Sequence, residues 1–526
     1  MATPQQKRAD SLEALQTLQK QGVLAIRSSD LSRIHRERLV KGGFLQEVMK
    51  GWYIPSRPDE GRDESTTWYA SFWDFCAAYL TVRFKENWSL SPEQSLFIHT
   101  GNRTVPRQLL VRSPRARNKV TALAHDTSLL EVRAPLPSEG REAIVDGLRL
   151  FSLPAALVAV GAGLFTRNAT EARAALAMVR DASEVLTILL SGGHSVVAGR
   201  LAGAFRNIGR NRIADEIIQA MRAAGYDVRE SDPFDSPAPF THPSRALSPY
   251  VIRVRLSWQL MREVVLETFP ETPGIPKGTG AYLKAVDEIY VEDAYHSLSI
   301  EGYRVSRELI ERVRSGAWNP DGDSADWQQK DAMAAKGYYE AFQVVKGSVH
   351  QVLKGANAGH VFERDHGAWY RALFAPSVGA GILSAADLAG YRSGQVYIRR
   401  SKHVPPKPEA VRDTMPELIE LLRAEPDAGV RAVLGHFMFV YIHPYMDGNG
   451  RMGRFLMNLM LASGGYPWTV VPVERRHDYL KALEAASVGR NARPFSEFLG
   501  GLVRDRQKAT GTKARTIAKQ PAKRTA

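Results

Sequence analysis

Five prolines near the middle of the chain constrain its folding more than any other feature. They are Pro233, Pro237, Pro239, Pro243 and Pro249, all within 17 residues. Proline removes a backbone donor and blocks helices, so residues 231–250 are predicted to form a semi-extended linker. The chain has 526 residues, a length typical of about three or four domains. We therefore expect separate domains on either side of this linker.

Beyond the linker, residues 251–506 show the apolar periodicity of helices almost throughout. One interruption stands out, because Gly390 opens a turn that leads into an alternating, strand-like run over 395–399. A lone hairpin in a helical bundle has no sheet to complete, so this one is predicted to serve function. The expected fold class is mainly α: a C-terminal helical bundle with a β-hairpin flap, preceded by a winged helix-turn-helix and a mixed α/β middle domain.

Residues 1–56 are predicted to form three helices and a hairpin. Ser28 or Ser29 is a good N-cap for a helix over 30–40, and a basic turn at Lys50-Gly51 separates two short strands. This succession is the outline of a winged helix-turn-helix. Its expected recognition helix is rich in donors suited to phosphates and guanine edges. The candidate DNA-binding residues are Arg33, His35, Arg36, Arg38 and Lys50.

The segment LSRIHRERLVKGGFLQEVMKGWYI resembles the N-terminal winged helix of AbiEi-type antitoxins, which are transcriptional autoregulators. The resemblance implies DNA as a partner. The alternative is that these arginines form a solvated helix face.

Residues 57–230 have a mixed texture and no sharp motif. Apolar residues cluster over 68–80, and Leu96–His99 and Leu109–Val111 are predicted to be buried strands. Residues 103–119 hold six basic and no acidic side chains. Rather than a long helix, the prolines and glycines favour loops and a β-ribbon with a basic surface in this region. Ala-rich helices are expected after it, at 155–162, 170–190 and 213–224. AbiEi-type antitoxins carry a basic second domain, so the resemblance can extend here, but a structural spacer explains the composition equally well.

The chain has a net charge of +14, from 70 Lys and Arg against 56 Asp and Glu. Residues 1–56 contribute +4, and residues 103–119 and 507–526 contribute +6 each, so the rest is close to neutral. The surplus indicates an acidic partner such as nucleic acid. Residues 507–526 lack large apolar groups almost entirely and are predicted to be a disordered basic tail.

A single cysteine, Cys76, excludes an internal disulfide and a zinc site built from cysteines. The N-terminus lacks the apolar core of a signal peptide, and the most apolar stretch, 153–165, is too short to span a bilayer. The sequence thus predicts a soluble, cytoplasmic protein with no membrane partner.

The strongest motif runs from His443 to Arg454, with the sequence HPYMDGNGRMGR. An apolar helix arrives at His443, and the turn Asp447-Gly448-Asn449-Gly450 precedes a second helix. Glycine and asparagine tolerate left-handed backbone, so several N–H groups can converge on one anion at a helix N-terminus.

The side chains around this turn suit nucleotide chemistry. Arg451 and Arg454 lie three apart on one helix face and can bind neighbouring phosphates. Asp447 supplies a hard oxygen for Mg²⁺, and His443 can act as a base near neutral pH.

This segment resembles the Fic (Fido) domain signature, His-Pro-Phe-x-Asp/Glu-Gly-Asn-Gly-Arg-x-x-Arg, with Tyr445 in place of Phe. The resemblance implies transfer of AMP from Mg-ATP to a Ser, Thr or Tyr hydroxyl of a target protein or of the chain itself. It assigns His443 as the base, Asp447 as the Mg²⁺ ligand, and Gly448, Asn449, Gly450, Arg451 and Arg454 as phosphate ligands. The hairpin at Gln395, Val396, Tyr397 and Ile398 corresponds to the family's flap, which registers a target segment by strand pairing.

A second motif lies upstream, where Ser297, Glu301 and Gly302 close a predicted helix. Ser297-x-x-x-Glu301-Gly302 matches the inhibitory motif of Fic proteins. By resemblance, Glu301 pairs with Arg454, denies the γ-phosphate its place, and makes the enzyme autoinhibited from within its own chain.

Two functions stay open from the sequence. The first is an autoinhibited protein adenylyltransferase coupled to a DNA-binding module. The second is a DNA-binding transcriptional regulator, similar to an antitoxin, whose Fic half senses nucleotide or is toxin-like cargo. The target, the operator and oligomerisation stay open, as does the transferred group, since family members also use UMP, GMP, phosphocholine or phosphate and some remove AMP.

Overall fold

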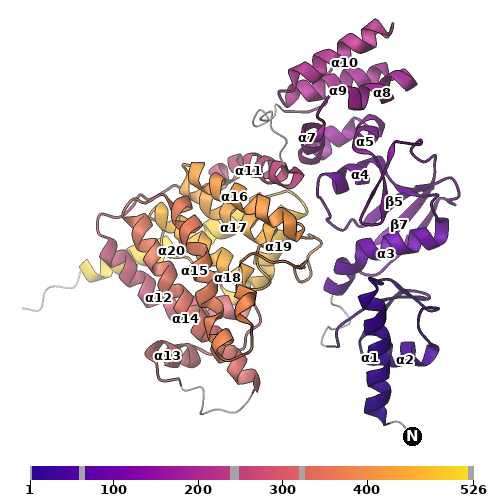
Figure 1. Ribbon diagram of the computed structural model, residues 1–526. Helices are drawn as coiled ribbons and strands as arrows, with labels where there is room; N and C mark the ends of the chain where they lie inside the picture. The colour runs from indigo at the N-terminus through magenta and orange to yellow at the C-terminus, as the bar shows by residue number, and fades with distance from the viewer. Residues whose placement is uncertain (1–2, 59–64, 237–247, 319–325, 389, 519–526) are drawn as a thin grey trace, which may run out of the picture. The chain divides into compact units, whose positions relative to one another are not determined.

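The computed structural model describes residues 3–58, 65–236, 248–318, 326–388 and 390–518 (Figure 1). The chain forms two compact units. The first comprises Met1–Arg253 together with Tyr397–Pro405, and the second comprises Val254–Val396 and Pro406–Ala526. Helices dominate both units, so the mainly α fold class predicted from the sequence is confirmed.

The first unit begins with two helices and a three-stranded antiparallel sheet. The helices are α1 (Pro4–Lys20) and α2 (Arg33–Lys41), and the strands are β1 (Ile26–Arg27), β2 (Leu45–Met49) and β3 (Trp52–Pro55), in the order β1-β3-β2. The predicted hairpin is present, since β2 pairs with β3 across Lys50-Gly51. Gly51 has φ +81°, the left-handed backbone that favours glycine in such a turn.

The predicted middle helix of this region is absent from the described residues, where β1 and turns lead directly to α2. The predicted cap was also wrong, because Ser32 rather than Ser28 or Ser29 accepts the N–H of His35. The reason is local: Asp30 accepts hydrogen bonds from the backbone and guanidinium of Arg27, which holds a turn there. The helix therefore starts only after this turn has closed.

A second layer of the first unit is built on helix α3 (Thr66–Phe84), whose aromatic side chains are buried. It packs near a four-stranded sheet in the order β4-β5-β7-β6, formed by Ser89–Leu90, Gln108–Ser113, Ser128–Arg133 and Lys119–Ala122 respectively. The predicted strand at Leu109–Val111 thus lies in β5. Strands β8 (Glu142–Val145) and β9 (Leu148–Phe151) form a separate antiparallel pair.

The prediction of a strand at Leu96–His99 was wrong, because these residues lie in α4 (Pro92–His99). The side chain of Ser91 accepts the N–H of Gln94, and Pro92 occupies the first helical turn, so the start signals for a helix precede the apolar run. A short apolar run alone cannot separate a buried strand from a buried helix.

The rest of the first unit is helical. Its helices are α5 (Leu153–Ala159), α6 (Gly163–Arg167), α7 (Ala169–Met178), α8 (Ser183–Gly192), α9 (Ser195–Asn207) and α10 (Asn211–Ala223). The helix expected over 170–190 is two helices, because Val179 is extended. Most of the proline-rich linker, residues 237–247, lies outside the described residues.

The second unit is a helical bundle around one large hydrophobic core. Its helices are α11 (Pro249–Thr268, whose first residues belong to the first unit), α12 (Thr279–Ile300), α13 (Arg307–Ser315), α14 (Asp326–Leu353), α15 (Ala358–Gly379), η1 (Ala385–Leu388), α16 (Pro408–Ala424), α17 (Ala428–Ile442), α18 (Asn449–Ser463), η2 (Val473–Arg475), α19 (Arg476–Ser487) and α20 (Arg493–Ala518). Helices α14, α15 and α18 lie side by side (Figure 1), and α18 is buried over nearly its whole length.

Residues 395–399 do not form the predicted strand. They are irregular, and a turn follows at 399–400. The physical reason is that a strand needs a partner for its backbone groups, and no strand of the described chain pairs with this segment. The segment Tyr397–Pro405 instead belongs to the first unit, where Val404 joins the core around α3 and the carbonyl of Lys402 accepts the N–H of Val105.

The predicted disordered tail starts inside a helix, because α20 continues to Ala518. Residues 507–518 are rich in Lys, Arg, Ala and Gln, which have good helix propensity and extend a helix that is anchored by buried residues such as Phe495 and Val503. Residues 519–526 lie outside the described part. Among the described residues, no helix has both the length and the apolarity needed to cross a membrane.

Candidate active site

The motif from His443 to Arg454 forms the connection between α17 and α18, two adjacent helices of the bundle. His443 ends α17 with φ +53°, a left-handed conformation that is costly for a residue with a side chain. Gly448 caps α18 with φ +78°. A Cβ atom at Gly448 would lie 2.9 Å from the ring of Phe374, so both the backbone and the packing demand glycine there.

The ring of His443 is oriented by its own helix. Nδ1 lies 3.1 Å from the carbonyl oxygen of Val440. A carbonyl can only accept, so this contact favours the tautomer with the proton on Nδ1 and leaves Nε2 with a lone pair. Burial lowers the pKa of His443 to about 4. The imidazole is therefore neutral at physiological pH and can accept a proton at Nε2.

The turn itself is braced by the side chain of Asn449. Its Oδ1 accepts the N–H of Tyr445 at 2.9 Å, and its Nδ2 donates to the carbonyl of Tyr445 at 2.8 Å. The Asn449 side chain therefore shapes the loop, while its backbone N–H belongs to the open first turn of α18. Tyr445 is 2% exposed, and its ring stacks on Tyr370 with centroids 3.8 Å apart, so it is a packing residue.

Both arginines of the motif are buried, with 1% of Arg451 and 3% of Arg454 exposed. The guanidinium of Arg451 lies between two aromatic rings, 5.2 Å from the centroid of Tyr303 and 5.0 Å from that of Phe374. Within the described chain, Nε of Arg451 and Nη1 of Arg454 are buried and have no hydrogen-bond partner. Unpaired buried guanidinium donors are costly, and an anion would satisfy them.

Asp447 is the only acidic side chain of the motif, and it is 69% exposed. One oxygen accepts the N–H of Gly448 at 2.6 Å, and the other lies 3.5 Å from Nη2 of Arg451. Among the described residues, no cluster of three or more His, Cys, Asp or Glu could hold a metal ion by itself. One exposed carboxylate fits Mg²⁺ when substrate phosphates supply further ligands, which is how this ion is often held.

The end of α12, with Ser297 and Glu301, reaches the same place. Ser297 accepts from Arg454 twice, through its hydroxyl at 2.8 Å and its carbonyl at 3.0 Å. Oε1 of Glu301 lies 2.7 Å from Nη2 of Arg454. Partial burial by itself would raise the pKa of Glu301, but the charge of Arg454 outweighs it and lowers this pKa. The carboxylate is therefore ionised. Gly302 follows with φ +91°, which turns the chain away from the helix.

Three further residues contact the motif and were missed by sequence reasoning. Tyr303 and Phe374 bracket Arg451, and Arg392 donates to the carbonyl of His443 at 2.8 Å. No local signal identifies them, because a loop arginine, a loop tyrosine and a helical phenylalanine are usually solvated or packed. Only their burial around the motif distinguishes them.

The residues predicted for the flap and for DNA binding lie outside the His443–Arg454 motif. Val396 is buried, Gln395 and Ile398 are half-buried, and Tyr397 is exposed, without the strand that was predicted. On α2, His35 contacts Ser11 and Arg36 donates to the carbonyl of Ser28, so both support the local fold. Arg38 donates to Lys7, Arg33 pairs with Glu37, and Lys50 is exposed in the turn of the hairpin.

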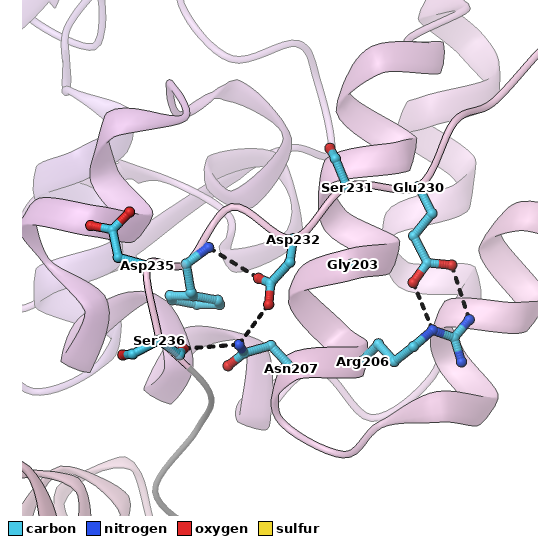
Figure 2. Close-up of a pocket in the computed structure, with 9 residues that line it drawn as sticks. Gly203, Arg206, Asn207, Glu230, Ser231, Asp232, Asp235 and Ser236 are labelled. Carbon is cyan, nitrogen blue, oxygen red and sulfur yellow. Dashed lines mark hydrogen bonds and ion pairs between the residues drawn. The ribbon is translucent and has the colours of Figure 1, made fainter.

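A hollow in the first unit, between α9 and residues 230–236, carries no comparable chemistry. Figure 2 shows that its polar groups bond one another: Arg206 pairs with Glu230, and Asn207 donates to Asp232 and to the carbonyl of Ser236. These contacts attach the segment to the helix.

Comparison with known proteins agrees with the motif. Residues 363–461 match the model of the Fic/DOC family. A protein adenylyltransferase Fic of Nematostella vectensis is 30% identical over 273 residues, which is 51% of this chain and 58% of that protein. One of Drosophila virilis is 29% identical over 229 residues, 43% of each. The chain thus spans about half the length of the curated relatives it matches.

Among solved structures, Fic-1 from C. elegans is similar with a TM-score of 0.38 and 20% identity, over 64% of this chain and 94% of that one. A Fic family protein from Desulfovibrio desulfuricans has a TM-score of 0.35 and 21% identity, over 52% and 77% of the two chains.

Proposed function

From the Fic domain that residues 363–461 match, we propose that this chain is an autoinhibited protein adenylyltransferase. It transfers AMP from Mg-ATP to a Ser, Thr or Tyr hydroxyl of a target protein or of itself. The observation that carries the proposal is the neutral His443, with Nε2 free to accept a proton, beside two buried arginines that keep unpaired donors. The relatives named as adenylyltransferases support it.

The triphosphate is bound by the start of α18. The first-turn N–H groups of Asn449 and Gly450 and the dipole of a 15-residue helix favour an anion. Arg451 and Arg454 neutralise the β- and γ-phosphates, with Nε of Arg451 and Nη1 of Arg454 as the unpaired donors. Asp447 would hold Mg²⁺, and the ion would supply positive charge that offsets the charge developing on the phosphates.

The proposed reaction is an in-line displacement at the α-phosphorus. The target hydroxyl gives its proton to Nε2 of His443, its oxygen forms a bond to the α-phosphorus, and the bond to the β-phosphate oxygen breaks. Pyrophosphate leaves with that electron pair. Such chemistry depends on positioning and charge stabilisation rather than on a protein nucleophile.

Inhibition follows from the position of Glu301. Its carboxylate accepts a hydrogen bond from Nη2 of Arg454. It also lies close to Gly450, where an added Cβ would be 2.2 Å from Oε1 of Glu301. A negative group over the start of α18 competes with phosphate for both the backbone N–H groups and the arginine. In this arrangement ATP can bind productively only when the end of α12 moves.

The flap role of Gln395, Val396, Tyr397 and Ile398 stays part of the proposal. The supporting observation is that these residues are irregular and belong to no sheet of the described chain, which suits the addition of a target segment by strand pairing. The proposal that AMP is the transferred group depends on the curated relatives, since we identify no side chain that selects the base.

A DNA-binding role of residues 1–56 is proposed as an accompanying function. It is supported by the hairpin beside α2 and by Arg33, whose side chain is 82% exposed. The rival reading is a DNA-binding regulator whose Fic half senses nucleotide. Internal contacts of His35 and Arg36 leave fewer side chains for DNA than the sequence predicted.

The test is intact-mass analysis of Glu301→Gly after incubation with Mg²⁺ and each nucleoside triphosphate. A mass increase of one nucleotide with ATP, absent in Glu301→Gly/His443→Ala, supports adenylylation and reports the transferred group. No increase with any triphosphate, together with a gel shift of the chain's own promoter, favours the regulator.

A further inference from the structure

Arg392 lies in the irregular segment between η1 and α16, yet only 1% of it is exposed. Its guanidinium donates to backbone carbonyls on two sides. Nε donates to His443 at 2.8 Å, and Nη2 lies 3.5 Å from the carbonyl of Ile442. Nη1 donates to Gly394 at 3.0 Å, and Nη2 also donates to Pro406.

These acceptors fall into two groups. Ile442 and His443 end α17, where the last carbonyls of a helix lack intrahelical partners and carry a partial negative charge. The backbone N–H of Arg392 adds a bond to the carbonyl of Pro444 at 2.9 Å. Gly394 and Pro406 are the two ends of the segment that contains the proposed flap. One side chain therefore ties the carbonyl end of α17 to both ends of that segment.

We infer that Arg392 is a positioning residue for the proposed transfer reaction: it holds His443 in its left-handed conformation and fixes the ends of the 394–406 segment relative to it. This inference rests on the proposed function for its catalytic meaning. Without Arg392, the carbonyl of His443 loses its donor, and the strained backbone at φ +53° loses a contact that maintains it. The general base and the two ends of this segment, Gly394 and Pro406, would then no longer be held in one geometry.

The charge of Arg392 affects the pKa of His443, which a purely packing role of this side chain would not do. The cation of Arg392 lowers the pKa of His443, in the same direction as burial, whereas the carboxylates of Glu301 and Asp447 raise it. Replacing Arg392 by a neutral residue should shift the His443 titration upward, and lysine should keep it in place.

The experiment compares Arg392→Gln and Arg392→Lys with a matched control, Arg431→Gln. Arg431 belongs to the same unit and also donates to a backbone carbonyl, that of Pro426 at 3.0 Å, and to Ser463. In the first arm, the full chain carries ¹³C-labelled histidine, and the His443 resonance is identified by its absence in His443→Ala. Its titration is followed by NMR without nucleotide. In the second arm, self-labelling by ATP is measured in the Glu301→Gly background.

We expect Arg392→Gln to raise the His443 titration midpoint and to reduce the labelling rate by about 10- to 100-fold, the usual cost of a misplaced reacting group. Arg392→Lys should keep the midpoint and recover part of the rate, with the KM for ATP little changed. Arg431→Gln should leave both near the parent. An unshifted midpoint in a folded Arg392→Gln, or an equal loss of labelling in Arg431→Gln, would overturn the inference.

If Arg392→Gln does not fold, Arg392→Lys alone tests the inference. A full labelling rate in Arg392→Lys would contradict a role for the several hydrogen bonds that the guanidinium donates to backbone carbonyls. If no triphosphate labels the Glu301→Gly variant itself, the proposed function fails. The NMR arm still tests Arg392 in that case.

Discussion

Oε1 of Glu301 lies 2.7 Å from Nη2 of Arg454, although 153 residues separate them in the chain. The same guanidinium also donates hydrogen bonds to the hydroxyl and the carbonyl of Ser297, one helical turn earlier. The end of α12 therefore covers an arginine that the proposed reaction needs for phosphate. Removing the carboxylate should free that arginine without disturbing the helix, since Glu301 lies at its last turn.

The first prediction follows directly. Glu301→Gly should raise self-labelling by ATP by at least about tenfold, the size of effect expected for losing one charged contact in a partly buried site. Glu308→Gly is a control, because Glu308 is an exposed acidic residue in the first turn of α13. Equal labelling in the parent and in Glu301→Gly would contradict autoinhibition by this residue.

The second prediction concerns pH. His443 accepts a proton only when neutral, and burial lowers its pKa to about 4. Labelling by Glu301→Gly should therefore stay flat between about pH 6 and 8 and fall only in more acidic buffer. An ordinary histidine would produce the acid limb near about pH 6.5. A limb at that higher pH would show that the base is not held in the buried environment described for His443.

The third prediction concerns the rings around Arg451. Each cation–π contact is worth about 0.5–2 kcal/mol, so Tyr303→Leu and Phe374→Leu should each raise the Kd for ATP by about 2- to 30-fold. Tyr295→Leu removes a similar contact with Arg307 outside the motif and should leave the Kd unchanged. Calorimetric titration in the Glu301→Gly background gives these values, and a comparable loss in all three variants would refute a specific role.

The local structure of the motif could be predicted more closely than the surrounding architecture. Helix α17 ends directly before His443 and α18 begins within the predicted glycine turn, because apolar periodicity and the turn residues are local signals. The contact between Glu301 and Arg454 was predicted only through resemblance to a known motif. Arg392 could not be predicted, since its acceptors are backbone carbonyls brought together by packing.

Other errors came from competing local signals. Leu96–His99 looked like a strand by composition, but the cap at Ser91 and the position of Pro92 determine a helix. Residues 395–399 alternate like a strand and still lack strand structure, because alternation provides no partner for the backbone. A pattern in the side chains predicts a face, whereas pairing depends on residues far away in sequence.

The fourth prediction compares two glycines with left-handed backbone. A methyl group added at Gly302 would meet open space, while at Gly448 a Cβ would lie 2.9 Å from Phe374. Gly302→Ala should cost about 1 kcal/mol of unfolding free energy from backbone strain alone. Gly448→Ala should cost about 1–3 kcal/mol more, since overpacking adds to the strain. Denaturant unfolding of both variants measures the difference, and equal costs would show that Phe374 gives way freely.

The last prediction uses His436, which is fully buried on α17 and lies 2.7 Å from the hydroxyl of Tyr479 through Nε2. Burial lowers the pKa of His436 to about 4 from an ordinary value of 6.5. A histidine whose pKa is depressed in the folded state contributes stability above its unfolded pKa, and this contribution is lost as the pH falls from about 6.5 toward 4. The loss should amount to about 1–2 kcal/mol at about pH 5.

His436→Gln should therefore be less stable than the parent at pH 7 but lose less stability on acidification. The control is His477→Gln at an exposed position, which should follow the parent at every pH. Thermal unfolding between about pH 5 and 7 tests this, and parallel curves for His436→Gln and the parent would show that the buried imidazole is not what makes the bundle sensitive to acid.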